Sequence, residues 1–168
     1  MLAAEAIRVT CSFLDKHFTP VPHTPEFDPQ PNWYMLLWQT EEFIHFTLLH
    51  ISSSGNATVS HLHPEVNVET TSFASYVHEH PKYKLMGVWV PKVSCKVTID
   101  PTLEWSSSFN CLSFCLETLG IPFNGASVDL GLWQTLLRDE SFVKSYLITE
   151  ALITGSVLVG KHVKSKNG

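Results

Sequence analysis

Five prolines fall between residues 19 and 32 of this chain, and they limit what that segment can form. Proline has no backbone N–H and clashes with the preceding turn, so residues 19–32 can be neither a continuous helix nor a central strand. We interpret them as an extended Pro-rich connector. Before it, residues 1–18 carry apolar side chains every three or four positions, which predicts an N-terminal helix. The connector therefore separates one helix from the rest of the chain.

Beyond the connector, short runs of aromatic and β-branched residues predict strands rather than helices. The runs are residues 33–37, 43–51, 58–62, 84–90 and 93–99. Gly55 and Asn56 tolerate positive φ, so the second and third runs are expected to form a hairpin. Residues 64–81 have few periodic apolar positions, and we expect a loop over one end of the sheet.

A helix is predicted to begin at Cys111. Asn110 is the expected N-cap, and Gly120 followed by Pro122 is typical of a helix end. Within the helix, four residues are spaced for one buried stripe: Cys111, Phe114, Cys115 and Leu119. Two further helices are expected at about 128–137 and 142–158. The predicted fold class is α+β, with a small antiparallel sheet packed against the helix that carries Cys111.

The length of 168 residues fits one domain. We divide it into the N-terminal helix (1–18), the connector (19–32), a core that holds the candidate site (33–120), and C-terminal helices with a basic tail (121–168). Apolar residues make up 44% of the chain and charged residues only 16%, a composition that argues against disorder.

Charge and cysteine usage exclude several functional classes. A formal net charge of -5 without a Lys/Arg cluster argues against a nucleic-acid partner. The chain has no C-x-x-C pair and no signal-peptide pattern, so we expect an intracellular, cytoplasmic location. Residues 146–160 are shorter than a bilayer span and contain Glu150, so we expect them to pack on the domain or at an interface rather than cross lipid. No Gly-rich phosphate loop is present, and we predict no cofactor.

Cys111 is the candidate nucleophile because of its position. A thiol attacks a carbonyl carbon as the thiolate, and the first turn of a helix favours negative charge through its unpaired N–H groups and dipole. The same N–H groups can hold the oxyanion formed on attack, with Asn110 as the cap. Cys115 lies one turn further in and is expected to be a small core residue. Buried packing is the alternative role for Cys111 as well.

A base must come from the histidines that precede the thiol: His45, His50, His61, His63, His78 and His80. The predicted hairpin can bring His45, early on one strand, close to His61, late on the next. This allows a thiol, a histidine base and a second histidine that orients the base.

In this order the residues resemble the permuted papain-like fold of the NlpC superfamily, and within it the lecithin:retinol acyltransferase-like (H-box/NC) proteins. That family has a histidine on the first strand of a hairpin, a second polar residue on the next, and an Asn-Cys pair that opens a helix. Residues 36–38 and 43–49 look like the strand pair that bears the first histidine, and residues 59–64 look like the strand that bears the second. Residues 110–114 are similar to Asn-Cys-x-x-Phe. The resemblance covers about residues 34–120. It implies that His45 is the general base, that His61 orients it and that Cys111 attacks the acyl carbon. A remote viral, peptidase or deubiquitinase-like relative, or an inactive one, fits the same pattern.

The expected function is a thiol-dependent hydrolase or acyl transferase that works through an acyl-Cys intermediate. Its substrate would be a peptide, a protein or an acyl lipid, and the lack of a clear membrane anchor favours an amide (peptide or isopeptide) over a lipid ester. One alternative is a His-rich metal site, because two His-x-His pairs could chelate a divalent ion through His61, His63, His78 and His80. The other alternative is a non-catalytic interaction module that retains the fold.

Overall fold

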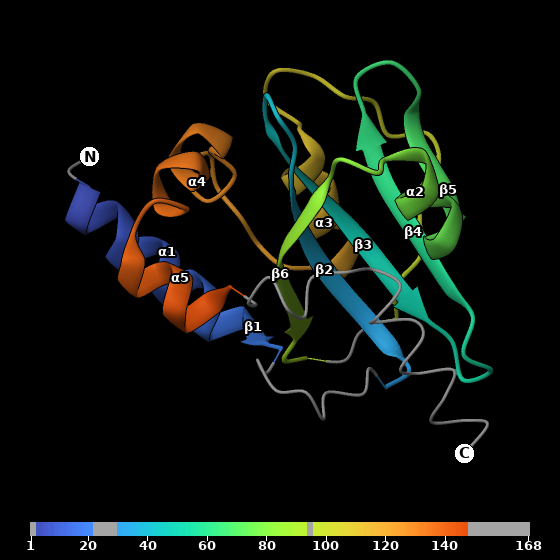
Figure 1. Ribbon diagram of the computed structural model, residues 1–168, viewed down its shortest axis with the longest axis horizontal. Helices are drawn as coiled ribbons and strands as arrows, with labels where there is room; N and C mark the ends of the chain where they lie inside the picture. The colour runs from blue at the N-terminus through green and yellow to red at the C-terminus, as the bar shows by residue number, and fades with distance from the viewer. Residues whose placement is uncertain (1–2, 22–29, 94–95, 148–168) are drawn as a thin grey trace.

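The computed structural model describes residues 3–21, 30–93 and 96–147. A six-stranded sheet with the order β1-β6-β2-β3-β4-β5 forms its centre, and every neighbouring pair is antiparallel (Figure 1). The strands are β1 (Phe18–Pro20), β2 (Asn32–Gln39), β3 (Ile44–Ile51), β4 (Ala57–His63), β5 (Asn67–Ser72) and β6 (Lys84–Pro91). The helices are α1 (Ala3–His17), α2 (Phe73–Glu79), α3 (Cys111–Leu119), α4 (Leu130–Leu136) and α5 (Glu140–Tyr146). The predicted α+β class with an antiparallel sheet is confirmed.

The two faces of the sheet pack against different helices because the side chains of β2 alternate between two apolar clusters. Met35 and Leu37 belong to a cluster that includes Phe114 and Leu116 of α3. The intervening residues Tyr34, Leu36 and Trp38 belong to a second cluster, together with Phe73 and Tyr76 of α2. Figure 1 shows α2 and α3 on opposite sides of the strands, with α1, α4 and α5 grouped near the β1 edge. The sheet is therefore the middle layer between α2 and α3.

The predicted hairpin is present as β3 and β4, joined through the turn that contains Gly55, whose φ is 88°. The N-terminal helix is present as α1. The connector begins differently from the prediction, because Phe18–Pro20 form β1 against β6. A three-residue edge strand tolerates proline, since its outward N–H groups need no partner in the sheet. Residues 22–29 of the connector lie outside the described part.

Two predictions about the core were wrong. Residues 64–81 are not a loop, because they form β5 and α2. β5 is polar apart from Val68, so it lacks the apolar alternation that marks a strand, and α2 buries only two residues. Residues 93–99 do not form the predicted strand in their described positions. Val97 and Ile99 instead pack as half-buried side chains of an irregular segment against the α3-side cluster.

The predicted helices at 128–137 and 142–158 correspond to α4 and α5, with α5 ending at Tyr146. The rest of the second prediction, the basic tail and most of residues 146–160 lie beyond the described part. Among the helices that the structure describes, none is long and apolar enough to cross a bilayer.

Candidate active site

Asn110 fixes the start of the helix that carries Cys111. Its side-chain Oδ1 accepts hydrogen bonds from the backbone N–H groups of Leu112 and Ser113, both at 3.0 Å, and its Nδ2 donates to the Val128 carbonyl at 2.8 Å. The Ser113 hydroxyl accepts in return from the Asn110 N–H, which completes a capping box. Asn110 is thus the predicted cap. An oxyanion at this helix start would be held by the Cys111 N–H.

The Cys111 sulfur meets the sheet where two strands separate. β3 and β4 pair from Leu48–Ser60 to Ile51–Ala57, whereas the later residues of β4 pair with β5 on their other side. Phe46, two residues before the end of that pairing, donates its backbone N–H to Cys111 Sγ at 3.4 Å. Cys111, which belongs to the α3-side cluster, lines the same pocket as Tyr76 of the α2-side cluster.

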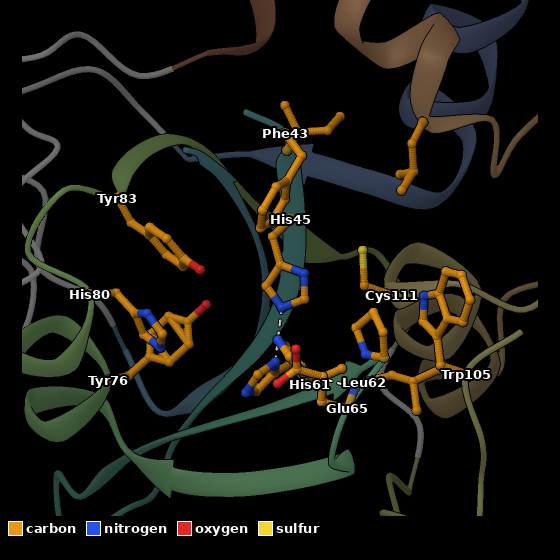
Figure 2. Close-up of a pocket in the computed structure, with 14 residues that line it drawn as sticks. Phe43, His45, His61, Leu62, Glu65, Tyr76, His80, Tyr83, Trp105 and Cys111 are labelled. Atoms are coloured by element: carbon orange, nitrogen blue, oxygen red, sulfur yellow. Dashed lines mark hydrogen bonds between the residues drawn. The ribbon is translucent and has the colours of Figure 1, made fainter. Parts of the chain in front are cut away.

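His45 and His61 lie on the α2 side of the sheet and contact each other. His45 is directly opposite Trp38, a member of the α2-side cluster, and facing residues of neighbouring strands share one face. The Nε2 atom of His45 lies 2.8 Å from Nδ1 of His61. Figure 2 shows the other ring nitrogen of His45, Nδ1, directed toward the side on which the Cys111 sulfur lies. The three residues that the sequence singled out therefore line one pocket.

Glu69 extends this set by one residue. It is directly opposite His61 in the β4–β5 register, and its Oε1 lies 3.1 Å from Nε2 of His61. The Glu69 side chain is 41% exposed, whereas that of His61 is 4% exposed. A continuous row of side chains thus leads from solvent through His61 and His45 toward Cys111.

Burial decides the charge state of these groups. It lowers the pKa of His45 to about 3, and the neighbouring His61, His63 and His80 act in the same direction. It also lowers the pKa of His61, against the opposing effect of the Glu69 hydrogen bond and charge. Burial raises the pKa of the Cys111 thiol to about 11, although the backbone N–H of Phe46 and those of Leu112 and Cys111 at the helix start partly oppose the rise. At neutral pH the resting site therefore contains a protonated thiol beside neutral imidazoles.

The pocket over these residues has a volume of about 350 Å³. Its walls are largely aromatic and aliphatic, and none of the described side chains that line it is Lys or Arg. Besides the three candidate residues it is lined by Phe43, Ile44, Leu62, His63, Pro64, Glu65, Tyr76, His80, Tyr83, Trp105 and Leu130. The site can therefore enclose an apolar group beside the thiol.

Tyr76 contributes an unusual polar atom to the pocket. Its ring is 1% exposed and packs edge-on against the His61 ring, with the centroids 5.4 Å apart. Its hydroxyl has no hydrogen-bond partner among the described residues, and burial raises its pKa. Figure 2 shows this hydroxyl and that of Tyr83 both pointing into the space beside His45. A ligand in the pocket would meet an uncommitted hydroxyl there.

The remaining candidates lie apart from this arrangement. Cys115 is fully buried in the α3-side cluster, and burial raises its pKa well above the ordinary value. His50 stacks on Trp33, with ring centroids 4.4 Å apart. The predicted chelate of His61, His63, His78 and His80 is not assembled: no three His, Cys, Asp or Glu side chains in residues 3–21, 30–93 and 96–147 are placed to hold a metal ion. His61 instead bonds His45 and Glu69, and His80 stacks on Tyr83.

Sequence reasoning missed Glu69 and Tyr76, because the strand and helix that carry them were interpreted as a loop. Comparison with protein-family models, with curated proteins and with solved structures gives no match to this chain. A thiol at a helix start, with one imidazole in the same pocket and a second imidazole in contact with the first, is suited to acyl transfer.

Proposed function

We propose that this protein is a thiol-dependent acyl hydrolase or acyl transferase in which Cys111 is the nucleophile and His45 the general base. The observation that carries the proposal is the 2.8 Å contact between His45 Nε2 and His61 Nδ1, which leaves His45 Nδ1 on the side of the thiol. His61 is assigned as a positioning residue, since its Nδ1 contacts the base. Two buried histidines in contact beside a buried cysteine cost desolvation, and such costs are concentrated at functional sites.

The charge states favour general-base catalysis over a preformed ion pair. With the pKa of Cys111 at about 11 and that of His45 at about 3, a thiolate–imidazolium pair is unfavourable before substrate binds. His45 Nδ1 therefore takes the thiol proton while Sγ bonds to the carbonyl carbon and the π electrons move onto oxygen. The Cys111 N–H, at the start of α3, donates to that oxyanion.

The second half of the reaction returns the proton. The His45 imidazolium protonates the leaving group, the bond from the carbonyl carbon to that group breaks, and an acyl thioester remains on Cys111. Water or another acceptor then loses a proton to His45 as it attacks the thioester carbon. When the C–S bond breaks, Sγ recovers the proton, so the enzyme returns to its starting state.

An amide is the substrate that the pocket supports best. Among the described residues, the pocket lining includes Glu65 and neither Lys nor Arg, so a lipid phosphate would meet a carboxylate there and no described cation. The aromatic walls suit an apolar acyl portion beside the thiol. A peptide or isopeptide bond with an apolar residue on the acyl side fits both properties.

The test is acetylation of the full chain by p-nitrophenyl acetate, followed by intact mass and peptide mapping. We expect one acetyl group on Cys111, released by neutral hydroxylamine as a thioester is. The Cys111→Ala variant should lose this adduct, and the matched variant Cys115→Ala, changed one turn along the same helix, should keep it. Equal acetylation of the native chain and Cys111→Ala would overturn the proposal.

The bond preference has its own test. The same hexanoyl group is offered as the amide of aminomethylcoumarin and as the ester of a lysophospholipid. Faster release from the amide is expected. Faster release from the lipid would overturn the choice of an amide while leaving Cys111 as the nucleophile.

A further inference from the structure

The contact between His61 and Glu69 determines which way the hydrogen bonds of the site run. An ionised carboxylate has no proton to donate, so in the 3.1 Å contact the His61 Nε2–H is the donor and Glu69 Oε1 the acceptor. A neutral imidazole carries one N–H only. His61 Nδ1 is then unprotonated and must accept.

The direction of this bond determines the direction of the next one, between His45 and His61. Because His61 Nδ1 accepts, the 2.8 Å contact requires His45 Nε2–H as its donor. His45 is also neutral, so its Nδ1 carries a lone pair and no proton. That lone pair is on the side that faces the Cys111 sulfur in Figure 2. The opposite arrangement would place an N–H at Nδ1 of His45, and that ring could not take the thiol proton.

From this row of contacts we infer that Glu69 is a positioning residue that sets the tautomers of both histidines and so keeps His45 Nδ1 free to act as the base. The inference rests on the proposed function for its chemical consequence, but the tautomers themselves do not depend on it. Glu69 bonds His61, and His61 bonds His45, so Glu69 acts through His61. When His45 becomes protonated, the same row also places a carboxylate two hydrogen bonds from the new charge.

Geometry explains why Glu69 can do this. It lies opposite His61 in the β4–β5 register, so the two side chains share one face and their contact requires no long-range packing. Glu65 is the natural comparison, because it lines the same pocket and has the same side chain. The hydrogen bond found at Glu65 is made by its backbone N–H, which donates to His63 Nδ1 at 3.1 Å. Changing the Glu65 side chain therefore leaves this bond and the His61 contact in place.

The experiment measures tautomers directly, by long-range ¹H–¹⁵N correlation of the imidazole rings in the full chain at neutral pH. Signals are assigned with His45→Gln and His61→Gln. In the native chain both rings are expected as the Nε2–H tautomer. In Glu69→Gln the amide can either accept from or donate to His61, so the fixed pattern should give way to a mixture, whereas Glu65→Gln should leave it unchanged. A native His45 with its proton on Nδ1, or an unchanged pattern in Glu69→Gln, would overturn the inference.

A kinetic arm connects the tautomers to the chemistry. We expect Glu69→Gln to slow acetylation of Cys111 by p-nitrophenyl acetate at least about tenfold. This decrease should be smaller than the one caused by removing a carboxylate that bonds the base directly. Glu117→Gln, a change at an exposed glutamate outside this pocket, should retain the native rate. If the native chain is not acetylated at Cys111 at all, the proposed function fails while the tautomer result still decides the role of Glu69. If acetylation is normal and Glu69→Gln matches the native rate, the inference fails alone.

Discussion

Because His45 is buried, we expect the free energy of unfolding to fall in acid, and we expect a substitution of His45 to remove part of this fall. Its pKa is about 3 in the folded chain and 6.5 in the unfolded chain, so as the pH falls the unfolded state binds this proton first. Stability is therefore fully present above about pH 6.5 and is lost progressively toward about pH 3. Each pH unit in that window costs about 1.4 kcal/mol, so His45 alone removes about 2 kcal/mol of unfolding free energy between about pH 7.5 and about pH 5.

Urea unfolding at these two pH values measures the effect. The native chain and His45→Gln are compared, because glutamine offers an N–H close to the place of Nε2 and cannot be protonated. Other groups, including His61 with its lowered pKa, contribute to both proteins, so the difference between the two losses isolates His45. We expect His45→Gln to lose about 2 kcal/mol less than the native chain on acidification. His50→Gln, on the same strand but only half-buried, should behave as the native chain does. Equal losses in the native chain and His45→Gln would refute the claim that burial keeps this imidazole neutral.

Three further predictions follow from the site. Asn110→Ala should lower the free energy of unfolding, measured in urea, by about 1–2 kcal/mol, since two N–H groups lose their acceptor. This loss should be larger than that in Asp129→Ala, because the Asp129 side chain accepts from one N–H only. The reverse order would contradict the capping geometry. Tyr76→Phe should raise the free energy of unfolding by about 1 kcal/mol, because it removes a buried hydroxyl that has no partner among the described residues. Tyr83→Phe should not raise it. A lower free energy of unfolding in Tyr76→Phe would mean that the hydroxyl is bonded. The rate of Cys111 acetylation should be level between about pH 6 and about pH 9, because His45 stays neutral and the thiol stays protonated over this range; a rate that rises with an apparent pKa near 6.5 would point to an ordinary, exposed imidazole.

The sequence predicted those elements whose signal is local. Asn110 and Gly120 bracket α3 as a cap and a left-handed end, with φ of 72° at the glycine, and both signals are written in single residues. The β3–β4 hairpin followed from two β-rich runs around a glycine turn. The contact between His45 and His61 followed from the hairpin, because His45 lies early on one of its strands and His61 late on the next.

The sequence could not predict the parts that depend on tertiary context. β5 is a strand because β4 offers it a partner, and only Val68 of its residues is apolar. Without β5 there is no reason to place Glu69 opposite His61, so the contact of Glu69 with His61 could not be predicted from the sequence. The charge state of Cys111 was also out of reach, since the helix start favours a thiolate and burial opposes it, and only the structure shows that burial dominates.

In the proposed reaction, His45 removes the proton of Cys111 during attack on an acyl carbon. The most direct test is the single-turnover rate of Cys111 acetylation in folded His45→Gln relative to the native chain. Loss of a positioned general base should slow this step by about 10²- to 10⁴-fold, while binding of the ester is little changed. Acetylation of Cys111 in His45→Gln at a rate within a few-fold of the native rate would contradict the account.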